Sequence, residues 1–196
     1  VSAHKIRGPR GIGLLYLARR IEPFIRGGGQ ESGMRPGTEN LAGAWALSRA
    51  LETCCAQGIP REAASPEGES AGVTARRGSV QALSDRLIDS LLRIPGVSII
   101  PETRTASDPR FSPFVMQFTN DFLPGEVLVR ALSDRGVYIS TGSACSSRKK
   151  SRPVLDAMRV SPDRQQNAFR VSIGPSTESD DIEALGAALS AAFTGL

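Results

Sequence analysis

The chain has 196 residues and a mass of 20.8 kDa, enough for one substantial domain or two small ones. Three cysteines cannot form a fully paired disulfide framework, and no apolar run approaches the roughly 18 residues of a membrane-spanning helix. The net charge of +4 and the 5% of aromatic residues argue against direct nucleic-acid binding. The N-terminus lacks the apolar segment of a signal peptide, so we expect a cytoplasmic protein with reduced thiols and no membrane contact.

The first part of the chain predicts a strand, a glycine-rich loop and a helix. The apolar run at 12–17 is typical of a buried strand. The glycine-rich segment 27–38 ends at Thr38, a good N-cap, so we expect a helix over 39–56. Residues 58–80 are rich in Gly, Pro, Ser, Ala and charge without apolar periodicity, which indicates a flexible linker or insertion.

The second part alternates helices and strands. The expected elements are a helix from Gln81, strands at 97–100 and 114–118, a helix at 125–135, a strand at 137–140, a short helix at 153–158, a strand at 169–173 and a helix from about Glu178. This order favours an α/β fold in which helices cover a small sheet.

Lys5 is a candidate catalytic residue. It ends the segment Ser2-Ala3-His4-Lys5, which leads into the glycine-rich turn 8–13. A lysine beside such a turn is commonplace and has a plain interpretation as a surface residue. Its functional interpretation is a Schiff-base lysine, which binds an aldehyde cofactor and then moves protons at the substrate Cα. The glycines would let the backbone approach that cofactor closely.

Cys145 differs from the other two cysteines. It lies in the polar segment 140–147, and the cations at 148–152 follow it closely, which would lower the pKa of its thiol. A mobile thiolate suits a reaction that collects sulfur in one place and delivers it in another. Cys54 and Cys55 lie on the expected first helix, where we interpret them as partly buried structural thiols.

Two further features are candidate anion sites. Arg170 starts an expected core strand, where its planar fork suits a carboxylate ligand, although a structural ion pair with Asp or Glu would also explain it. Segment 27–40 brings glycines to a helix N-terminus, where backbone N–H groups and Thr38 could hold a phosphate. It is not a Walker A loop, because no Gly-Lys-Ser/Thr follows at the required spacing.

Taken together and in this order, these motifs resemble those of the cysteine desulfurases. These are pyridoxal-phosphate enzymes of the class V aminotransferase family, with the aspartate-aminotransferase-like fold. The matching segments are SAHK with GPRGIG, GGGQESGMRPGTEN, STGSACSS and RVSIGPST. The resemblance implies a remnant of the large cofactor-binding domain at 1–57, the linker at 58–80, and the complete small α/β domain at 81–196.

The resemblance also implies roles for individual residues in holding pyridoxal 5'-phosphate. Lys5 resembles the lysine that binds the cofactor covalently, and Ser2 and His4 resemble residues that contact its phosphate. Thr38 resembles the phosphate ligand that reaches the cofactor of the other subunit in a homodimer. No metal site is expected.

The implied reaction converts L-cysteine to L-alanine. Cys145 resembles the nucleophile that becomes a persulfide, and Arg170 resembles the residue that binds the substrate carboxylate. The sulfur would pass to an acceptor or scaffold protein for iron–sulfur cluster assembly or for thiolation. The alternatives are a selenocysteine lyase or another class V transferase, and an inactive C-terminal remnant that binds partners.

The sequence departs from the family pattern in three ways. The cofactor lysine is residue 5, and the single histidine, His4, already belongs to the lysine motif, so none is left to stack on the cofactor ring. Segment 58–80 resembles an insertion, and Arg148-Lys149-Lys150 replaces an acidic segment found in one branch of the family. We therefore expect this chain by itself to be inactive.

Overall fold

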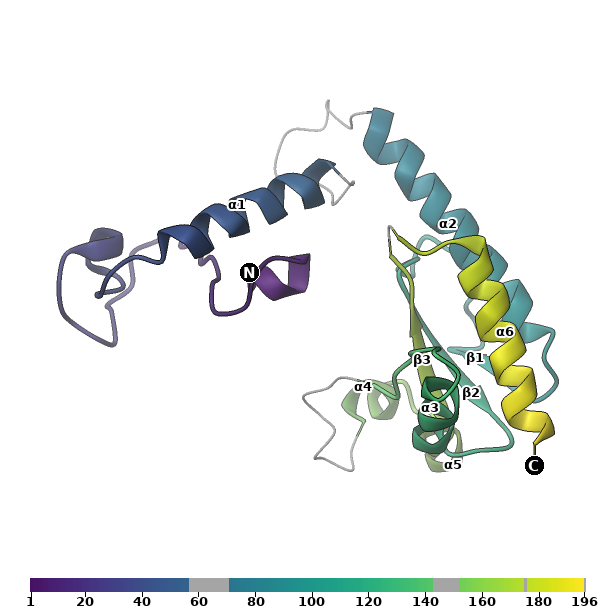
Figure 1. Ribbon diagram of the computed structural model, residues 1–196. Coiled ribbons are helices and arrows are strands. Elements are labelled where there is room, and N and C mark those ends of the chain that lie inside the picture. Colours follow the sequence, from purple (N-terminus) through teal and green to yellow (C-terminus); the bar gives the residue numbers. More distant parts are fainter. Residues whose placement is uncertain (57–70, 143–151, 175, 196) are drawn as a thin grey trace. The chain divides into compact units, whose positions relative to one another are not determined.

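A computed structural model describes residues 1–56, 71–142, 152–174 and 176–195 (Figure 1). The chain divides into two compact units, which we call unit 1 (Val1–Arg76) and unit 2 (Arg77–Leu196). Within the described residues no helix combines the length and the hydropathy that a membrane span requires.

Unit 2 is built on a three-stranded antiparallel sheet in the order β1-β2-β3 (Figure 1). The strands are β1 (Val97–Ile100), β2 (Val115–Asn120) and β3 (Ala168–Ser172), so three of the expected strands are confirmed within one or two residues. The strand expected at 137–140 is wrong, because only Ser140 makes a bridge, to β3.

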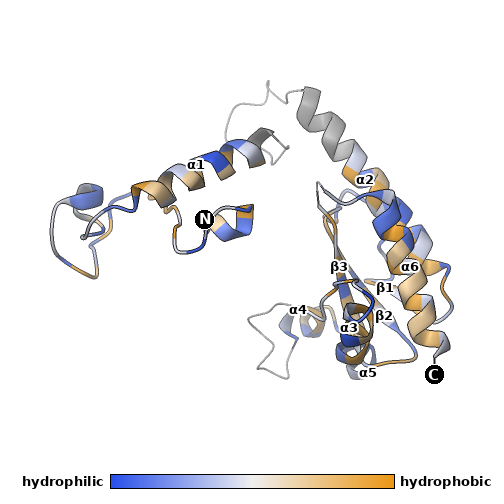
Figure 2. Ribbon diagram, viewed as in Figure 1, coloured by the Kyte–Doolittle hydropathy of each residue, from blue (hydrophilic) through white to orange (hydrophobic). Residues whose placement is uncertain are grey.

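One face of the sheet carries the main core. Helices α2 (Ala71–Leu92), α3 (Gly125–Ser133) and α6 (Ser179–Thr194) supply the side chains that cover it. Phe118 and Phe169 face each other across β2 and β3 and stack with ring centroids 5.7 Å apart. Figure 2 shows that α6 is hydrophobic over much of its length, with hydrophilic residues at its N-terminal end. Because successive side chains of a strand point to opposite faces of the sheet, every second residue of each strand lies in this core.

The opposite face of the sheet has a smaller apolar cluster. Ile100, Leu155 and Ala168 form it, with Leu155 supplied by the short helix α4 (Pro153–Ala157). A second short helix, α5 (Pro162–Gln166), follows and contacts β2; the sequence patterns gave no sign of it. Polar residues of β2 and β3, including Arg170, also belong to this face.

Helix α2 begins ten residues before the start expected from Gln81. Residues 71–80, assigned above to the linker 58–80, are helical, and Val80 is buried in the main core. That part of the linker prediction is wrong: the stretch belongs to α2 although its local periodicity is weak, and α2 is buried in the core from Val80 onward. The division into a large-domain remnant and a small domain stays a prediction.

Unit 1 contains two short 3₁₀ helices, η1 (Ala3–Ile6) and η2 (Gln30–Gly33), and the long helix α1 (Leu41–Ala56). The expected helix is confirmed, but its start is two residues later than predicted. Asn40 replaces Thr38 as the cap, since its Oδ1 accepts a hydrogen bond from the Gly43 N–H at 2.9 Å. A side-chain oxygen there satisfies one of the unpaired N–H groups at a helix start.

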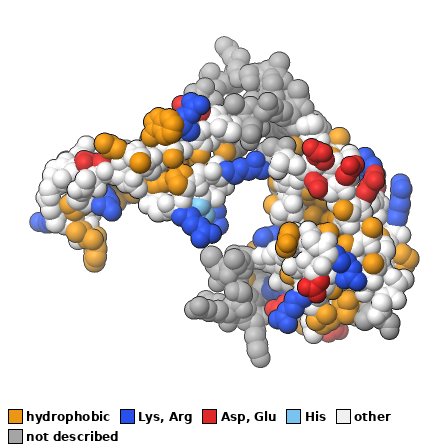
Figure 3. Space-filling view, in the orientation of Figure 1, with side chains coloured by type: hydrophobic (Ala, Val, Ile, Leu, Met, Phe, Trp, Pro, Cys, Tyr) orange, Lys and Arg blue, Asp and Glu red, His pale blue; other side chains and the backbone are white. Residues whose placement is uncertain are grey.

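The strand expected at 12–17 is also wrong. Gly13 makes one bridge to Ser2, and the next three residues are exposed, with Tyr16 at 83% exposure. Ala3 and Leu47 are the only buried hydrophobic residues described in unit 1. Hydrophobic atoms accordingly lie on the surface of the part of the chain that includes α1 (Figure 3).

Candidate functional site

Ser2, His4 and Lys5 lie together in one turn at the start of unit 1. Ser2 precedes η1 and its carbonyl accepts a hydrogen bond from the Lys5 N–H at 2.9 Å. Buried Ala3 anchors the turn, because its N–H donates to the Ile12 carbonyl at 3.1 Å. The side chains of Ser2, His4 and Lys5 are all exposed. The turn thus presents a hydroxyl, an imidazole and an amine to an approaching ligand.

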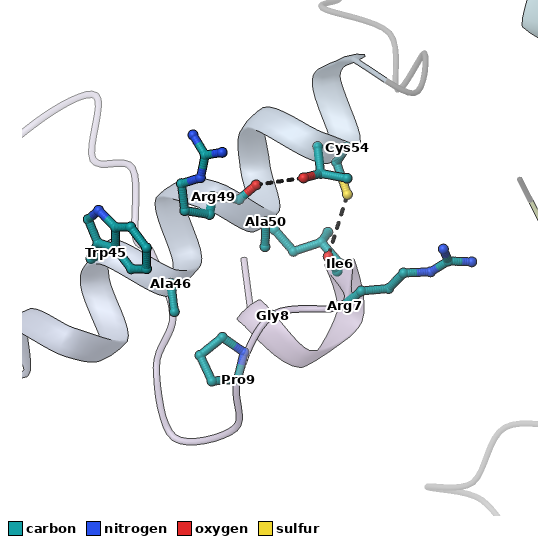
Figure 4. A pocket seen from close by; sticks show the side chains of 10 residues that line it. Ile6, Arg7, Gly8, Pro9, Trp45, Ala46, Arg49, Ala50 and Cys54 are labelled. Carbon is teal, nitrogen blue, oxygen red and sulfur yellow. Dashed lines mark hydrogen bonds between the residues drawn. The ribbon is translucent and has the colours of Figure 1, made fainter.

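The segment after Lys5 packs against α1. Gly8 lies close to both Ala3 and Ala50, since a Cβ added to Gly8 would be 3.0 and 3.2 Å from their methyl carbons. The Cys54 thiol donates to the Ile6 carbonyl at 3.5 Å, as Figure 4 shows. Cys54 is half-buried, in agreement with the partly buried position expected for it. These contacts fix the lysine turn on the helix.

A hollow of about 440 Å³ lies between this segment and α1 (Figure 4). Its lining is mostly apolar, with two arginines among the lining residues, which are Ile6, Arg7, Gly8, Pro9, Trp45, Ala46, Arg49, Ala50, Thr53 and Cys54. Lys5 is next in sequence to this lining but not part of it. The hollow is therefore a neighbour of the candidate cofactor turn and not the turn itself.

Thr38 lies in the irregular segment between η2 and α1, and its side chain is exposed. Because Asn40 caps α1, Thr38 is outside the helix, and its role as a helix cap is wrong. Gly37 just before it has a φ of +100°, a backbone conformation that favours glycine. The exposed hydroxyl stays available to a ligand, so its role as a phosphate contact stays a prediction.

Arg170 lies in the middle of β3, in unit 2. Its backbone exchanges two hydrogen bonds with Ser140, and the Ser140 Oγ donates to the Gly142 carbonyl at 2.7 Å. Ser140 opens the polar segment that contains Cys145 five residues later. The start of the cysteine segment is thus fixed beside the candidate carboxylate-binding arginine.

Cys145 itself lies outside the described residues, as do Arg148, Lys149 and Lys150 and the side chain of Cys55. Arg152, the last cation of that group, is described and is half-buried. Its Nη1 donates to the Ala168 carbonyl at 3.3 Å. Burial lowers the pKa of its guanidinium, and the charge of Glu126 opposes that shift. Arg152 therefore makes a hydrogen bond to β3 in addition to adding positive charge near the cysteine segment.

The chain matches the family model described as aminotransferase class V over residues 1–185. It belongs to this family. Its relatives include a cysteine desulfurase of Enterobacter agglomerans, 35% identical over 93% of this chain and 41% of that protein. The cysteine desulfurase IscS of Methanosarcina thermophila is 32% identical over 93% of this chain and 41% of that protein. The chain thus spans about two fifths of the length of these relatives.

Solved structures agree with the fold assignment. A NifS-like protein covers the whole chain with a TM-score of 0.74 and 26% sequence identity, while the chain covers 46% of that structure. The cysteine desulfurase CsdA of Escherichia coli matches with a TM-score of 0.70 at 22% identity, covering all of this chain and 45% of its own. The α/β class V aminotransferase fold predicted from the motifs is confirmed. Members of this family depend on pyridoxal phosphate.

Proposed function

We propose that this protein takes part in the desulfuration of L-cysteine. In the overall reaction the substrate sulfur atom passes to the Cys145 thiol, so that L-cysteine and a protein thiol give L-alanine and a protein persulfide. The Cys145 thiolate would supply the electron pair of the new S–S bond, while the pair of the broken substrate C–S bond would stay on the carbon, which takes up a proton to become the methyl group of alanine. The oxidation of sulfur is thus balanced by the reduction of that carbon, and no external oxidant or reductant is required. The observation that carries the proposal is the fixed attachment of the cysteine segment beside Arg170.

The residues of the N-terminal turn fit part of a pyridoxal-phosphate site. Lys5 offers an exposed primary amine, and none of the ion pairs found among the described residues includes it. Ser2 and His4 offer donors to the phosphate from the same turn. When bound, the cofactor would draw electrons away from the substrate Cα. His4 is the only histidine of this sequence, so no second histidine is left to stack on the cofactor ring.

Each of the three remaining roles belongs to one residue of this chain. Lys5 would remove and return the proton at the substrate Cα. Arg170 would hold the substrate carboxylate through its guanidinium, which is always charged and suits two-point binding. The Cys145 thiolate would attack the substrate sulfur, helped by neighbouring cations that favour its deprotonated form.

We further propose that the sulfur passes to a protein acceptor in the cytoplasm, for iron–sulfur cluster assembly or thiolation. A homodimer is part of the proposal, because Thr38 would then contact the cofactor phosphate of the partner subunit. The exposure of the Thr38 hydroxyl supports this arrangement.

A first experiment tests the cofactor role of Lys5. The chain holds only three lysines, Lys5, Lys149 and Lys150, so a covalently bound cofactor is easily located. Incubation with pyridoxal phosphate, borohydride reduction and peptide mass spectrometry should find the label mainly on Lys5. Lys5→Arg should remove that label, because a guanidinium stays protonated. Equal labelling of all three lysines would contradict the assignment.

A second experiment tests sulfur transfer. This chain would replace the matching segment of the Enterobacter agglomerans cysteine desulfurase, which supplies the remaining part of that enzyme. The chimera should form L-alanine and carry the persulfide on Cys145. Cys145→Ser should abolish the persulfide, while Cys54→Ser is the matched control that should retain it. Persulfide on Cys54 or Cys55 would refute the proposed mechanism.

A further inference from the structure

Gln117 lies directly opposite Arg170 in the sheet. Gln117 on β2 and Arg170 on β3 are register partners, one residue on from the stacked pair Phe118 and Phe169. Directly opposed residues of antiparallel strands have Cβ atoms about 5 Å apart and point to the same face. That face is the one opposite the main core, so the two polar side chains emerge side by side away from the phenylalanine rings.

Both side chains carry a buried donor without an acceptor. The Gln117 Nε2 and the Arg170 Nε are shielded from solvent, yet neither has a hydrogen-bond partner within the described part of the chain. Neighbouring polar groups on the same face are paired: the Thr119 hydroxyl donates to the Arg164 carbonyl at 2.9 Å, and the Arg164 guanidinium donates to Ser98. Because buried donors are nearly always paired, two unpaired donors in one register pair indicate an acceptor that is missing.

The chemistry of the pair indicates the kind of acceptor. Arg170 is positively charged, and none of the ion pairs found among the described residues includes it. An ionised carboxylate only accepts hydrogen bonds, and its two oxygens together offer about four lone-pair sites. Both residues are half-buried as a whole, although the two donor atoms themselves are covered, so a carboxylate reaches these donors only when the partly exposed side chains turn outward.

We propose that Gln117 is a second carboxylate-binding residue, donating from its side-chain amide to the same carboxylate that Arg170 binds. The proposal rests on the proposed function in that this carboxylate is the one of the amino-acid substrate. Arg170 supplies the charge, and Gln117 supplies a neutral donor from the adjacent strand. Since the sheet register fixes both backbones side by side, only the two side chains would have to turn toward the ligand.

The test is a titration with sodium acetate, observed by NMR on the ¹⁵N-labelled chain. Acetate offers the carboxylate alone, without the amino or thiol groups of cysteine, and sodium chloride at equal ionic strength is the control. The Arg170 Nε–H and the Gln117 side-chain amide signals, assigned through Arg170→Lys and Gln117→Met, should both move downfield with one shared Kd. Chloride should move neither signal.

Gln117→Met keeps the length of the side chain and removes both its donor and its acceptor. It should weaken acetate binding about tenfold, the expected effect of losing one hydrogen bond to a charged group. Gln166→Met is the matched control, because Gln166 is exposed on α5 and lies outside the pair. Its acetate affinity should stay within about twofold of the original, as expected for an exposed surface position.

Two results would overturn the proposal. One is an Arg170 signal that responds to acetate while the Gln117 amide signal and the effect of Gln117→Met are both absent. The other is an Arg170 Nε–H signal already at a hydrogen-bonded position without acetate, because a Gln117 amide rotated by 180° would then accept from it. The result of the acetate titration can be distinguished from the test of the proposed function, because the chimera can form L-alanine whether or not acetate binds Gln117.

Discussion

The two units keep their shapes by different means. In unit 2, side chains from three helices fill one face of the sheet around Phe118 and Phe169, both fully buried. Unit 1 has only Ala3 and Leu47 as described buried hydrophobic residues, and Trp45 is 70% exposed. Its lysine turn is held instead by backbone hydrogen bonds, such as that from the Ala3 N–H to the Ile12 carbonyl.

This difference bears on the candidate site. Arg170 is built into a sheet with a packed core, so its backbone position is fixed by many contacts at once. Lys5 and Thr38 lie on segments with few buried contacts, and such segments open at low cost in free energy. We therefore expect the carboxylate-binding part of the site to be rigid and the cofactor turn to depend on its ligand for order.

The largest effect is expected from Phe118→Ala. Removing a fully buried aromatic ring costs about 3–5 kcal/mol, which should unfold much of unit 2. Trp45→Ala, in exposed surroundings of unit 1, should change stability by no more than about 0.5 kcal/mol. Urea unfolding followed by circular dichroism measures both. A similar loss of unfolding free energy in the two variants would contradict the proposed difference between the units.

The next effect is expected at the start of α3. A Cβ on Gly125 would lie 2.2 Å from the Ala168 carbonyl oxygen, a backbone atom that cannot move aside without shifting β3. Gly125→Ala should therefore cost about 1–3 kcal/mol in the free energy of unfolding. Gly29→Ala is the matched control in unit 1, since a Cβ there meets nothing within 4 Å. Thermal unfolding should show a clear drop for Gly125→Ala only.

A smaller effect is expected at the start of α1. Asn40→Ala removes the oxygen that accepts from the Gly43 N–H and should cost about 1 kcal/mol of helix stability. Hydrogen exchange of the α1 amides measures this local loss, and Asn40→Asp should restore protection because it keeps the oxygen. Unchanged exchange in Asn40→Ala would mean that contacts other than the cap hold α1 in place.

The smallest effect concerns pH. Burial opposes ionisation of Asp85, but hydrogen bonds from Ser107 and Gln81 and the charge of Arg104 outweigh it and lower the pKa of this carboxyl. A carboxyl whose pKa is lowered by folding stabilises the folded state at pH values above its unfolded-state pKa. This stabilisation is lost as the pH falls through the folded-state pKa. Asp85→Asn should thus be less stable than the original near neutrality, with a difference that shrinks below about pH 4.

Unfolding midpoints at several pH values measure this contribution. Asp89→Asn is a matched control on the same helix, because no hydrogen bond or ion pair involving Asp89 is found in the described structure. A constant difference between the original chain and Asp85→Asn across the pH range would show that the hydrogen bonds act without linkage to ionisation.

The sequence by itself determined the family, the α/β class and the order of the main elements. Short strand-like segments predicted the three strands, helical spacing predicted α1, α3 and α6, and the local motifs identified Lys5, Thr38 and Arg170 as candidates. These features depend on residues close together in the chain, where backbone sterics and side-chain periodicity act directly.

Tertiary structure decided what depends on distant partners. The apolar run at 12–17 has strand composition but lacks a paired neighbour strand in the described structure, while residues 71–80 have weak periodicity but join a helix that packs on the sheet. The pairing of Gln117 with Arg170 is of the same kind, because the two residues are far apart in the sequence and only the register of β2 and β3 brings them together. Register depends on the packing of a whole sheet face, which no local pattern records.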